Sequence, residues 1–386
     1  MDRDAFSLLA GSMEISSPRV LMLGWEFPPA LTGGLGVACE GLVGALGSMV
    51  PLRLWLPGMA SGSGGAEVSP LDPYAGGGGA YGSDLAQRVK SFAEWAADRA
   101  DAGEFDVIHA HDWMTIPAAW AVRGKTGRPM ILHLHSLEFD RAGSGGSGWI
   151  RRIEQTGMRT ADRVVVVSRY MAEVCVREYG IGPRRLEVVH NGVTPVETWK
   201  VDTGSPKLLF VGRFTDQKSP EVFVRMAERV ARRIPEATFV MAGDGELLDP
   251  MRRLAAELGL AGRIRFPGFL QRGQLNAELA TTSLLCLPSR SEPFGLVALE
   301  AAQFGVPTVA FPQCGATEVL ASSEIVKKPG PDAMADAVCE LLSDPERLAG
   351  RGRQARAEAA DSTWACAAER FLRIYRSLSN GLQNSG

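Results

Sequence analysis

Residues 289–300 combine the side chains and the turn chemistry that an anion-binding site needs. The segment reads Ser-Arg-Ser-Glu-Pro-Phe-Gly-Leu-Val-Ala-Leu-Glu, so two carboxylates, Glu292 and Glu300, flank a Pro-Phe-Gly turn. A strand-like apolar run at 284–287 precedes the segment, and a helix-like run extends to near Gly305. Because the first N–H groups of a helix have no partner within it, they favour a bound anion such as a phosphate. The two acids would hold a sugar and a ribose on either side of that anion.

The same residue types predict how the helix begins. Pro293 suits the first helical position, where a missing N–H is harmless, and Ser291 and Glu292 suit capping positions. The backbone at 295–297 would then face the anion, with a glycine that allows close approach. Side chains on a helix lean toward its start, so Glu300 is placed to accept hydrogen bonds from ribose hydroxyls. The alternative is an amphipathic helix with two solvated acids.

Two cations follow another strand-like run. Arg213 and Lys218 lie five residues apart after the apolar residues 208–211. A guanidinium can bind two diphosphate oxygens at once, and an ammonium adds a point charge. We therefore expect a diphosphate here, the alternative being exposed, solvated cations. Gly243 belongs to an Ala-Gly-Asp-Gly-Glu motif at the end of the next strand, which is either a wall of the same pocket or an ordinary turn.

A glycine-rich loop follows the first predicted strand. It contains Gly33, Gly34 and Gly36 before a helix-like run, and its backbone N–H groups could surround a phosphate. The alternative is a simple glycine turn. A dinucleotide fingerprint is excluded because its third glycine position holds Cys39.

Four of the five histidines form two H-x-H pairs. His109 and His111 form one pair, next to Asp112, and His133 and His135 form the other. Alternate residues on a strand share a face, so metal binding has to be considered. A catalytic metal would need more histidine or acidic ligands, and only one further histidine remains. We therefore expect no metal, and we favour hydrogen bonding of one or two of these histidines to a sugar, with satisfied buried histidines as the alternative.

Composition narrows the class of protein. The chain has 386 residues, 45% hydrophobic and 22% charged, which predicts a globular protein of two domains. A net charge of −3 argues against a nucleic-acid partner.

Six scattered cysteines predict small core residues in a reducing compartment. The apolar runs are too short to span a bilayer, and residues 1–4 lack the pattern of a signal peptide, so we expect a cytoplasmic protein. A basic helix-like run at 149–163 allows membrane contact, but its acids favour a solvated face.

The order of the elements predicts an α/β fold. Short apolar runs alternate with helix-like segments, the pattern of parallel sheets with crossover helices. The strand-like runs are 20–24, 52–56, 107–110, 130–134, 164–167 and 186–189, then 208–211, 238–242, 264–266, 283–287, 308–311 and 325–327. This pattern predicts two doubly wound, Rossmann-like domains in series, 1–194 and 195–362, with a link near 193–206. The Gly/Ser-rich residues 58–82 predict a surface loop.

Taken together, these motifs resemble the retaining nucleotide-sugar glycosyltransferases of the two-domain B-type fold. The similarity is to the family-4 group, also called group 1, and the N-terminal motifs are similar to those of glycogen and starch synthases. It rests on Glu292 with Glu300, on Arg213 with Lys218, on the Gly-Gly loop, and on the segments 109–113 and 135–139. Glycogen synthases carry a lysine two residues before the Gly-Gly pair, where this chain has Leu31.

The resemblance implies two domains that face a cleft, with a helix at 363–380 returning to the N-terminal domain. That domain would bind the acceptor, and the C-terminal domain would bind a nucleotide diphosphate sugar (ADP-glucose, UDP-glucose or GDP-mannose). His135 would lie near the transferred sugar and Asp112 on the acceptor side. The residues implied to bind the donor are Gly33, Gly34, Arg213, Lys218, Gly243, Phe294, Gly295, Leu296, Val297 and Glu300, with Glu292 at the donor sugar and phosphates.

The expected reaction is a metal-independent transfer of a hexosyl group, glucosyl in the first instance, with retained anomeric configuration and no cofactor. The alternatives are an α-glucan synthase that uses ADP-glucose, a phosphorylase or epimerase of the same fold, and a non-catalytic binder. A metal-dependent hydrolase built on the H-x-H pairs belongs to a different class and is the least favoured.

Overall fold

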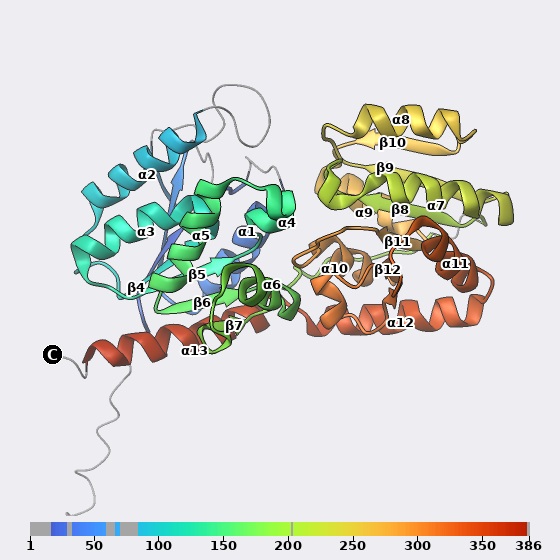
Figure 1. Cartoon of the computed structure of the whole chain (residues 1–386). Coiled ribbons are helices and arrows are strands. Elements are labelled where there is room, and N and C mark those ends of the chain that lie inside the picture. Colours follow the sequence, from blue (N-terminus) through green and yellow to red (C-terminus); the bar gives the residue numbers. More distant parts are fainter. Residues whose placement is uncertain (1–16, 29–32, 59–65, 70–83, 202–203, 384–386) are drawn as a thin grey trace, which may run out of the picture.

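The computed structural model describes residues 17–28, 33–58, 66–69, 84–201 and 204–383. Within these residues the strands form two parallel sheets, one in each half of the chain (Figure 1). The first sheet has seven strands in the order β3-β2-β1-β4-β5-β6-β7. Its strands are β1 (Val20–Leu23), β2 (Leu52–Pro57), β3 (Ala66–Ser69), β4 (Val107–His111), β5 (Met130–Leu134), β6 (Arg163–Val166) and β7 (Leu186–Val188).

Crossover helices join these strands, as a parallel sheet requires. They are α1 (Gly34–Leu46), α2 (Leu85–Arg99), α3 (Asp112–Thr126), α4 (Glu138–Ala142), α5 (Gly148–Thr160) and α6 (Arg169–Tyr179), with short 3₁₀ turns η1 (Gly143–Gly145) and η2 (Pro183–Arg185).

The second sheet has six parallel strands in the described residues, in the order β10-β9-β8-β11-β12-β13. They are β8 (Lys207–Val211), β9 (Thr238–Ala242), β10 (Ile264–Gly268), β11 (Leu284–Leu287), β12 (Thr308–Ala310) and β13 (Glu324–Ile325). The connecting helices are η3 (Asp216–Lys218), α7 (Pro220–Arg233), α8 (Leu248–Glu257), α9 (Arg272–Ala280), α10 (Leu296–Gln303) and η4 (Gly315–Glu318). After the last strand come α11 (Pro331–Leu342), α12 (Pro345–Asp361) and α13 (Trp364–Gln383).

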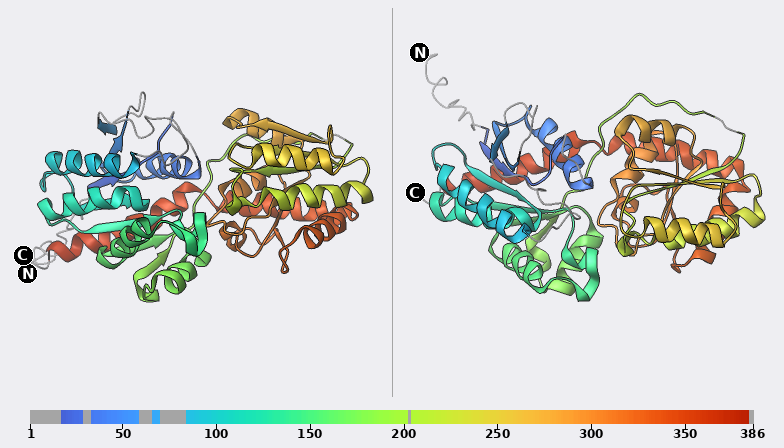
Figure 2. Two further views of the ribbon diagram at one scale, coloured as in Figure 1. Left: turned by 45° about the horizontal axis from the view of Figure 1, so that its top comes forward. Right: turned by 90° about the horizontal axis from the view of Figure 1, so that it is seen from above.

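The central strands are apolar because helices cover both faces of each sheet. All residues of β1, β4, β5 and β11 are buried. These strands therefore lack the alternation of apolar and polar residues found in a sheet with one face in solvent. The two sheets lie side by side with their helical layers, and the domains meet along one edge (Figure 2). Because each parallel sheet presents the carboxyl ends of its strands at one edge, loops that carry polar motifs collect at that edge.

The last helix returns to the first domain. Helix α13 leaves α12 beside the second sheet and runs beneath the first (Figures 1 and 2). It packs on α1 and places Phe371 and Tyr375 in the same core cluster as Val20 and Met22. The Trp364 ring lies so close to Gly41 that a Cβ there would meet it at 2.2 Å. The predicted fold, with its returning helix, is therefore confirmed.

Each predicted strand is found, with ends that differ by at most two residues. One strand was missed: β3 lies within the predicted loop at 58–82, so that prediction was wrong at Ala66–Ser69. The remainder of that stretch from residue 59, like residues 1–4 and Leu31, lies outside the described residues. Five cysteines are buried as predicted, but Cys366 is exposed. In the described parts of the chain, no helix has both the length and the apolar character needed to cross a membrane.

Candidate active site

The loop before α10 differs from the predicted helix start. Pro293 is not the first helical residue, because the helix begins at Leu296, with Gly295 as its N-cap at φ 93°. This left-handed backbone suits glycine and turns the chain into the helix. Ser291 and Glu292 are therefore loop residues rather than caps. The N–H groups of Leu296 and Val297 have no acceptor within the helix, so the free helix start lies at the predicted residues 295–297 although the helix begins three residues later than Pro293.

Glu292 and Lys218 form an ion pair. The Lys218 Nζ lies 2.7 and 2.6 Å from the two carboxylate oxygens of Glu292, and Ser289 donates a third hydrogen bond of 2.9 Å. Glu292 is buried, with 6% of its surface exposed. Lys218 follows β8 and Glu292 follows β11. Because these two strands are neighbours in the sheet, the two side chains meet at its edge.

Arg213 follows β8 at the same edge. Its Nη2 donates a 3.3 Å hydrogen bond to Gln217, whose own Nε2 donates to the backbone oxygen of Ser291. The glycines after β9 pack directly on this loop: a Cβ at Gly243 would meet the Gly212 oxygen at 1.9 Å. With φ of 132°, Gly243 supports the loop through its backbone, so it acts here as a close-packed spacer between two strand ends.

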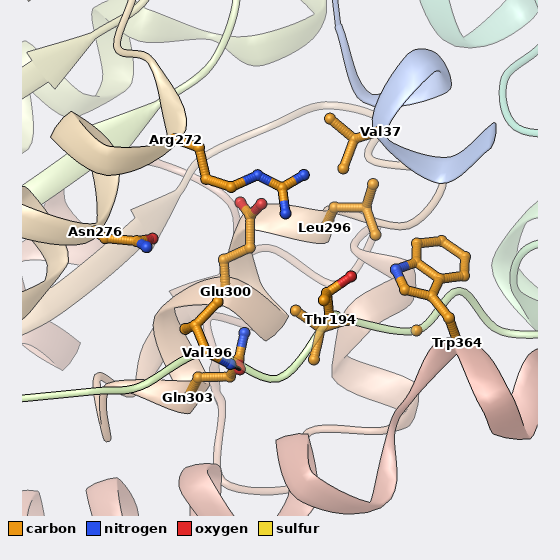
Figure 3. Close-up of a pocket in the computed structure, with 11 residues that line it drawn as sticks. Val37, Thr194, Val196, Arg272, Asn276, Leu296, Glu300, Gln303 and Trp364 are labelled. Carbon is orange, nitrogen blue, oxygen red and sulfur yellow. Dashed lines mark hydrogen bonds between the residues drawn. The ribbon is translucent and has the colours of Figure 1, made fainter. Parts of the chain in front are cut away.

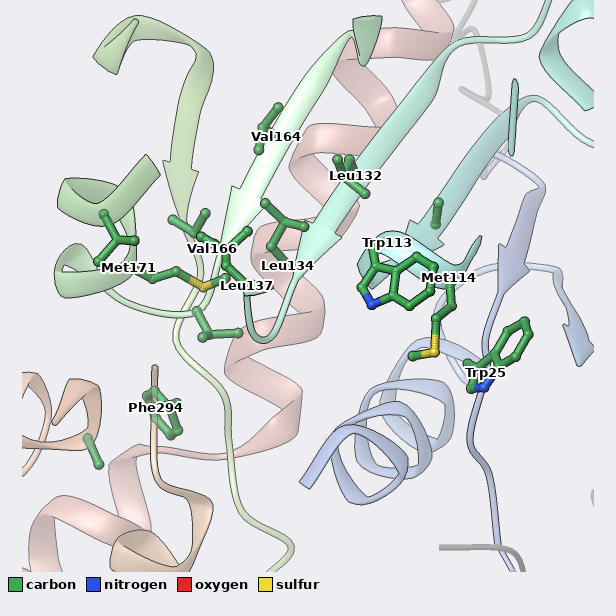
Figure 4. Packing of buried hydrophobic residues seen from close by; sticks show 14 of the residues in the cluster. Trp25, Trp113, Met114, Leu132, Leu134, Leu137, Val164, Val166, Met171 and Phe294 are labelled. Carbon is green, nitrogen blue, oxygen red and sulfur yellow. The ribbon is translucent and has the colours of Figure 1, made fainter. Parts of the chain in front are cut away.

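The Glu292 loop also contacts the first domain. Ser291 donates a 2.6 Å hydrogen bond to Asp140 and lies 2.8 Å from the Tyr170 hydroxyl. Ser168 donates a 2.6 Å hydrogen bond to the backbone oxygen of Pro293. Figure 4 shows Phe294 beneath the side chains of Met171 and Leu137, and all three belong to one buried cluster. The Phe294 side chain is therefore a core residue at the domain junction.

A second contact joins the domains beside the first. Glu318 accepts hydrogen bonds from the backbone N–H groups of Arg169 and Tyr170, at the start of α6, and from His190 at 2.8 Å. Burial alone raises the pKa of the Glu318 carboxyl, but these hydrogen bonds lower it more, so its pKa lies below the usual value. Glu318 thus acts as a charged cap on α6 from the other domain.

Glu300 lines a pocket between α10, α9 and the first domain. Its carboxylate faces Arg272, and Leu296 and Val37 close the pocket on the α1 side (Figure 3). Burial raises the pKa of Glu300, and the Arg272 charge partly opposes that shift. Arg272 also forms a 3.1 Å ion pair with Glu40 of α1. The pocket therefore contains one of the two predicted acids.

The glycine-rich loop reaches the same region. A Cβ at Gly34 would come within 3.8 Å of Leu296 at the start of α10, whereas one at Gly33 would meet no described atom within 4 Å. Gly34 thus faces the helix start across the domain junction. A ligand phosphate there would have backbone N–H groups available from two sides.

His135 and Asp112 form a separate group at the ends of β4 and β5. Asp112 has an unusual positive φ of 55° and accepts a 2.6 Å hydrogen bond from the His135 backbone N–H. Burial raises the pKa of Asp112 to about 7, although hydrogen bonds from the N–H groups of His135 and Ser136 oppose it. The His135 ring is half-buried and lies 2.9 Å from His111 Nδ1. This group has no described hydrogen bond or ion pair to Lys218, Glu292 or Glu300.

Comparison with solved structures defines the class of fold. The catalytic domain of Arabidopsis thaliana starch synthase IV, solved with ADP and acarbose, aligns with a TM-score of 0.75 over 95% of this chain and all of that one, at 17% identity. Sucrose-phosphate synthase from Thermosynechococcus elongatus gives 0.79 over 94% of this chain and 100% of that one, at 20% identity. An Anabaena protein solved with UDP-glucose gives 0.72 over 93% and 99%, at 19% identity. The fold is that of the B-type glycosyltransferases.

The sequence comparisons define the family. Residues 196–358 match the model of the glycosyl transferases group 1, and residues 33–197 match that of glycosyltransferase family 4. Alpha-maltose-1-phosphate synthase of Mycobacterium tuberculosis is 32% identical over 93% of this chain and 99% of its own length. Glycogen synthase of the same organism is 28% identical over 94% and 95%. The chain therefore belongs to the group 1 glycosyltransferases.

Proposed function

We propose that this glycosyltransferase moves a hexosyl group from a nucleoside diphosphate sugar to an acceptor, with retained configuration and without a metal ion. The observation that carries the proposal is the Lys218–Glu292 pair, placed at the same sheet edge as the free N–H groups of α10. A cation, a helix start and the facing Gly33-Gly34 loop supply three sources of positive potential for one diphosphate.

The leaving diphosphate gains negative charge as the glycosidic bond breaks. Preorganised positive groups stabilise such charge better than mobile water does. Lys218 and Arg213 would supply charge-assisted hydrogen bonds, and the N–H groups of Leu296 and Val297 would add dipoles. This arrangement takes the role that a divalent cation fills in metal-dependent transferases. Glu300 would accept the ribose hydroxyls in the pocket beside Arg272.

The sugar would lie between the two domains. Glu292 and the backbone at 294–297 would contact it from the donor side, and His135 and Asp112 from the other. The bond between C1 and the phosphate oxygen breaks, while a bond from C1 to the acceptor oxygen forms on the same face. The acceptor proton passes to the leaving phosphate oxygen. Glu292 is already paired with Lys218, which argues against a covalent role for that carboxylate.

Glucose is the hexose that the relatives favour. Their names include starch synthase and glycogen synthase, and the solved neighbours were obtained with ADP or with UDP-glucose. The test incubates the protein with ADP-glucose, UDP-glucose and GDP-mannose, and records thermal stabilisation, nucleotide release and the anomeric configuration of the product by NMR. The expected result is an α-linked product from an α-linked glucosyl donor, with activity that is the same with and without added Mg²⁺ or Mn²⁺. An inverted product, or activity that requires added Mg²⁺ or Mn²⁺, would refute the proposal.

Two variants separate donor binding from general stability. Glu300→Gln should raise the KM for the donor by roughly 10- to 100-fold, because a hydrogen bond to a charged group is worth about 1.5–3 kcal/mol. The exposed Glu94→Gln is the matched control. An unchanged KM in the Glu300 variant would show that Glu300 does not bind the ribose, while the proposed roles of the other residues would stand.

An α-glucan synthase is the second candidate, and the glycogen synthase relative, similar over 94% of this chain, favours it. The alpha-maltose-1-phosphate synthase relative favours a small phosphorylated acceptor instead. Offering a glucan and a hexose phosphate as competing acceptors decides between them. Incubation of glucan with inorganic phosphate tests the phosphorylase alternative, which requires release of a sugar phosphate.

A further inference from the structure

Four histidine rings, three from buried residues and the fourth from the half-buried His135, form one cluster on the face of the first sheet that α13 covers. His111 and His133 are direct partners in the pairing of β4 with β5, so their side chains share a face. The ring of His109 stacks on that of His111 at 4.4 Å, and the ring of His133 lies 4.1 Å from that of His135. Phe371 of α13 covers both strands, at 4.9 Å from the His109 ring and 4.8 Å from the His133 ring.

Five ring nitrogens in this cluster are buried without a hydrogen-bond partner among the described residues. They are His109 Nε2, His111 Nε2, His133 Nδ1, His133 Nε2 and His135 Nδ1. A buried polar atom without a partner costs about 1–3 kcal/mol, and most such atoms in proteins have one. Five in a single cluster therefore indicate a ligand that satisfies several of them together.

The geometry selects the class of that ligand. One nitrogen from each of His109, His111 and His133 lies within 4.8 Å of the others. A tetrahedral metal with Zn–N bonds of about 2.0–2.1 Å requires ligand atoms about 3.4 Å apart, so nitrogens within 4.8 Å would have to approach one another by at most about 1.4 Å. All three rings are buried, with at most 1% of each residue exposed, so a bound ion would be shielded from solvent.

The other ring nitrogens have orienting partners. His109 Nδ1 lies 2.7 Å from the Tyr375 hydroxyl, and His111 Nδ1 lies 2.9 Å from His135 Nε2 and 3.6 Å from the Cys39 sulfur. Such a second contact fixes the ring and leaves Nε2 as the free donor, which is how ligand histidines are usually held. In both rings, the nitrogen that lacks a partner is Nε2.

We propose that His109, His111 and His133 bind one divalent transition-metal ion, with zinc as the best match to three imidazoles. The ion would tie β4 to β5 directly beneath Phe371 and Tyr375 of α13. Its role would be structural, since the three ligand histidines have no described hydrogen bond or ion pair to Lys218, Glu292 or Glu300. The inference is independent of the proposed reaction, because a metal-free transfer step and a structural ion are compatible.

The test uses the full chain without a histidine tag, purified without added metal. Elemental analysis should find about one equivalent of zinc per chain, or the protein should take up one equivalent of added Zn²⁺ or Co²⁺. Bound Co²⁺ should show the intense visible absorption of a tetrahedral site, and removal by a chelator should lower the melting temperature. The His133→Gln variant should lose metal binding, while His190→Gln, a histidine outside the cluster, should keep it.

Two results would overturn the proposal. The first is wild-type protein that holds no metal as purified and neither binds nor is stabilised by added Zn²⁺ or Co²⁺. The second is a folded His133→Gln variant that binds metal as the wild type does, which would place the ion elsewhere. If that variant fails to fold, the wild-type Co²⁺ spectrum still decides whether a tetrahedral nitrogen site exists.

Discussion

Ser291 in the loop before α10 donates a 2.6 Å hydrogen bond to Asp140 in α4, which belongs to the other domain. Both residues are buried, with 6% and 4% of their surfaces exposed. Because Glu292 is the next residue, this contact links the position of its carboxylate to the position of the first domain. The Tyr170 hydroxyl, 2.8 Å from the same serine, adds a second partner.

Removing the Ser291 hydroxyl should destabilise the protein. Ser291→Ala leaves Asp140 without one of its hydrogen-bond donors, so the free energy of unfolding should fall by about 1–3 kcal/mol. Turnover should fall as well, because the Glu292 loop loses its side-chain hydrogen bond to Asp140 of the first domain. Denaturant unfolding and steady-state kinetics measure the two effects. Ser48→Ala, which removes an exposed hydroxyl with only a local bond, is the control. Equal stability of the two variants would contradict the prediction.

The Lys218 ammonium should matter mainly for turnover. Lys218→Ala removes one preorganised positive group at the proposed diphosphate, so kcat should fall by roughly 10²-fold or more. The variant also leaves Glu292 buried without its cation, so its melting temperature must be measured beside its activity. Lys90→Ala removes an exposed lysine and is the matched control. Wild-type turnover in a folded Lys218 variant would exclude the assigned role.

Gly243 should tolerate no side chain. In Gly243→Ala the new Cβ would meet the Gly212 oxygen at 1.9 Å, on a backbone with φ of 132°. The loop that carries Arg213 must then move, and we expect both a lower melting temperature and weaker donor binding. Calorimetric titration with the nucleoside diphosphate measures the second effect. In Gly124→Ala, within α3, the new Cβ meets no described atom within 4 Å, so the variant should be neutral or slightly stabilising. Similar behaviour of the two variants would show that the loop absorbs the clash.

Glu318 should make the domain contact sensitive to acid. Its pKa is lower in the folded protein than in the unfolded chain, so its stabilising contribution is complete above the unfolded value of about 4.3. That contribution is lost as the pH falls through the lower, folded value. Melting temperatures between pH 7 and pH 3 should therefore converge for the wild type and Glu318→Gln at the acid end. A constant difference across the whole range would show that this carboxylate is not the responsible group.

The sequence predicted the strands well because each is a short, continuous apolar run between turns. It missed β3, since Ala66–Ser69 lies within a glycine- and serine-rich stretch. It also began α10 too early, at Pro293. Proline favours a first helical position, but here Gly295 adopts the left-handed backbone from which the helix starts.

The contacts that hold the loop at Glu292 could not be read from the sequence. Asp140 lies 151 residues from Ser291, and Glu318 lies 128 residues from His190. No spacing rule connects such pairs, because they meet only once two domains have packed. Arg272 was missed for the same reason. An arginine in a polar stretch gives no sign of a ligand-binding role in the sequence, and its place in the pocket is evident only once α9 lies beside Glu300. The sequence predicted that Lys218 and Glu292 belong to the same site. Their direct ion pair could be recognised only once the order of the strands was known.

Helix α13 has a consequence for the order of events during synthesis. The face of the first sheet that carries the histidine cluster is covered by Phe371 and Tyr375, which are translated more than 150 residues after β7. A nascent first domain therefore exposes an apolar sheet face while the second domain is being made. Such surfaces are prone to aggregation, so the ribosome-bound intermediate is where chaperone engagement would be greatest.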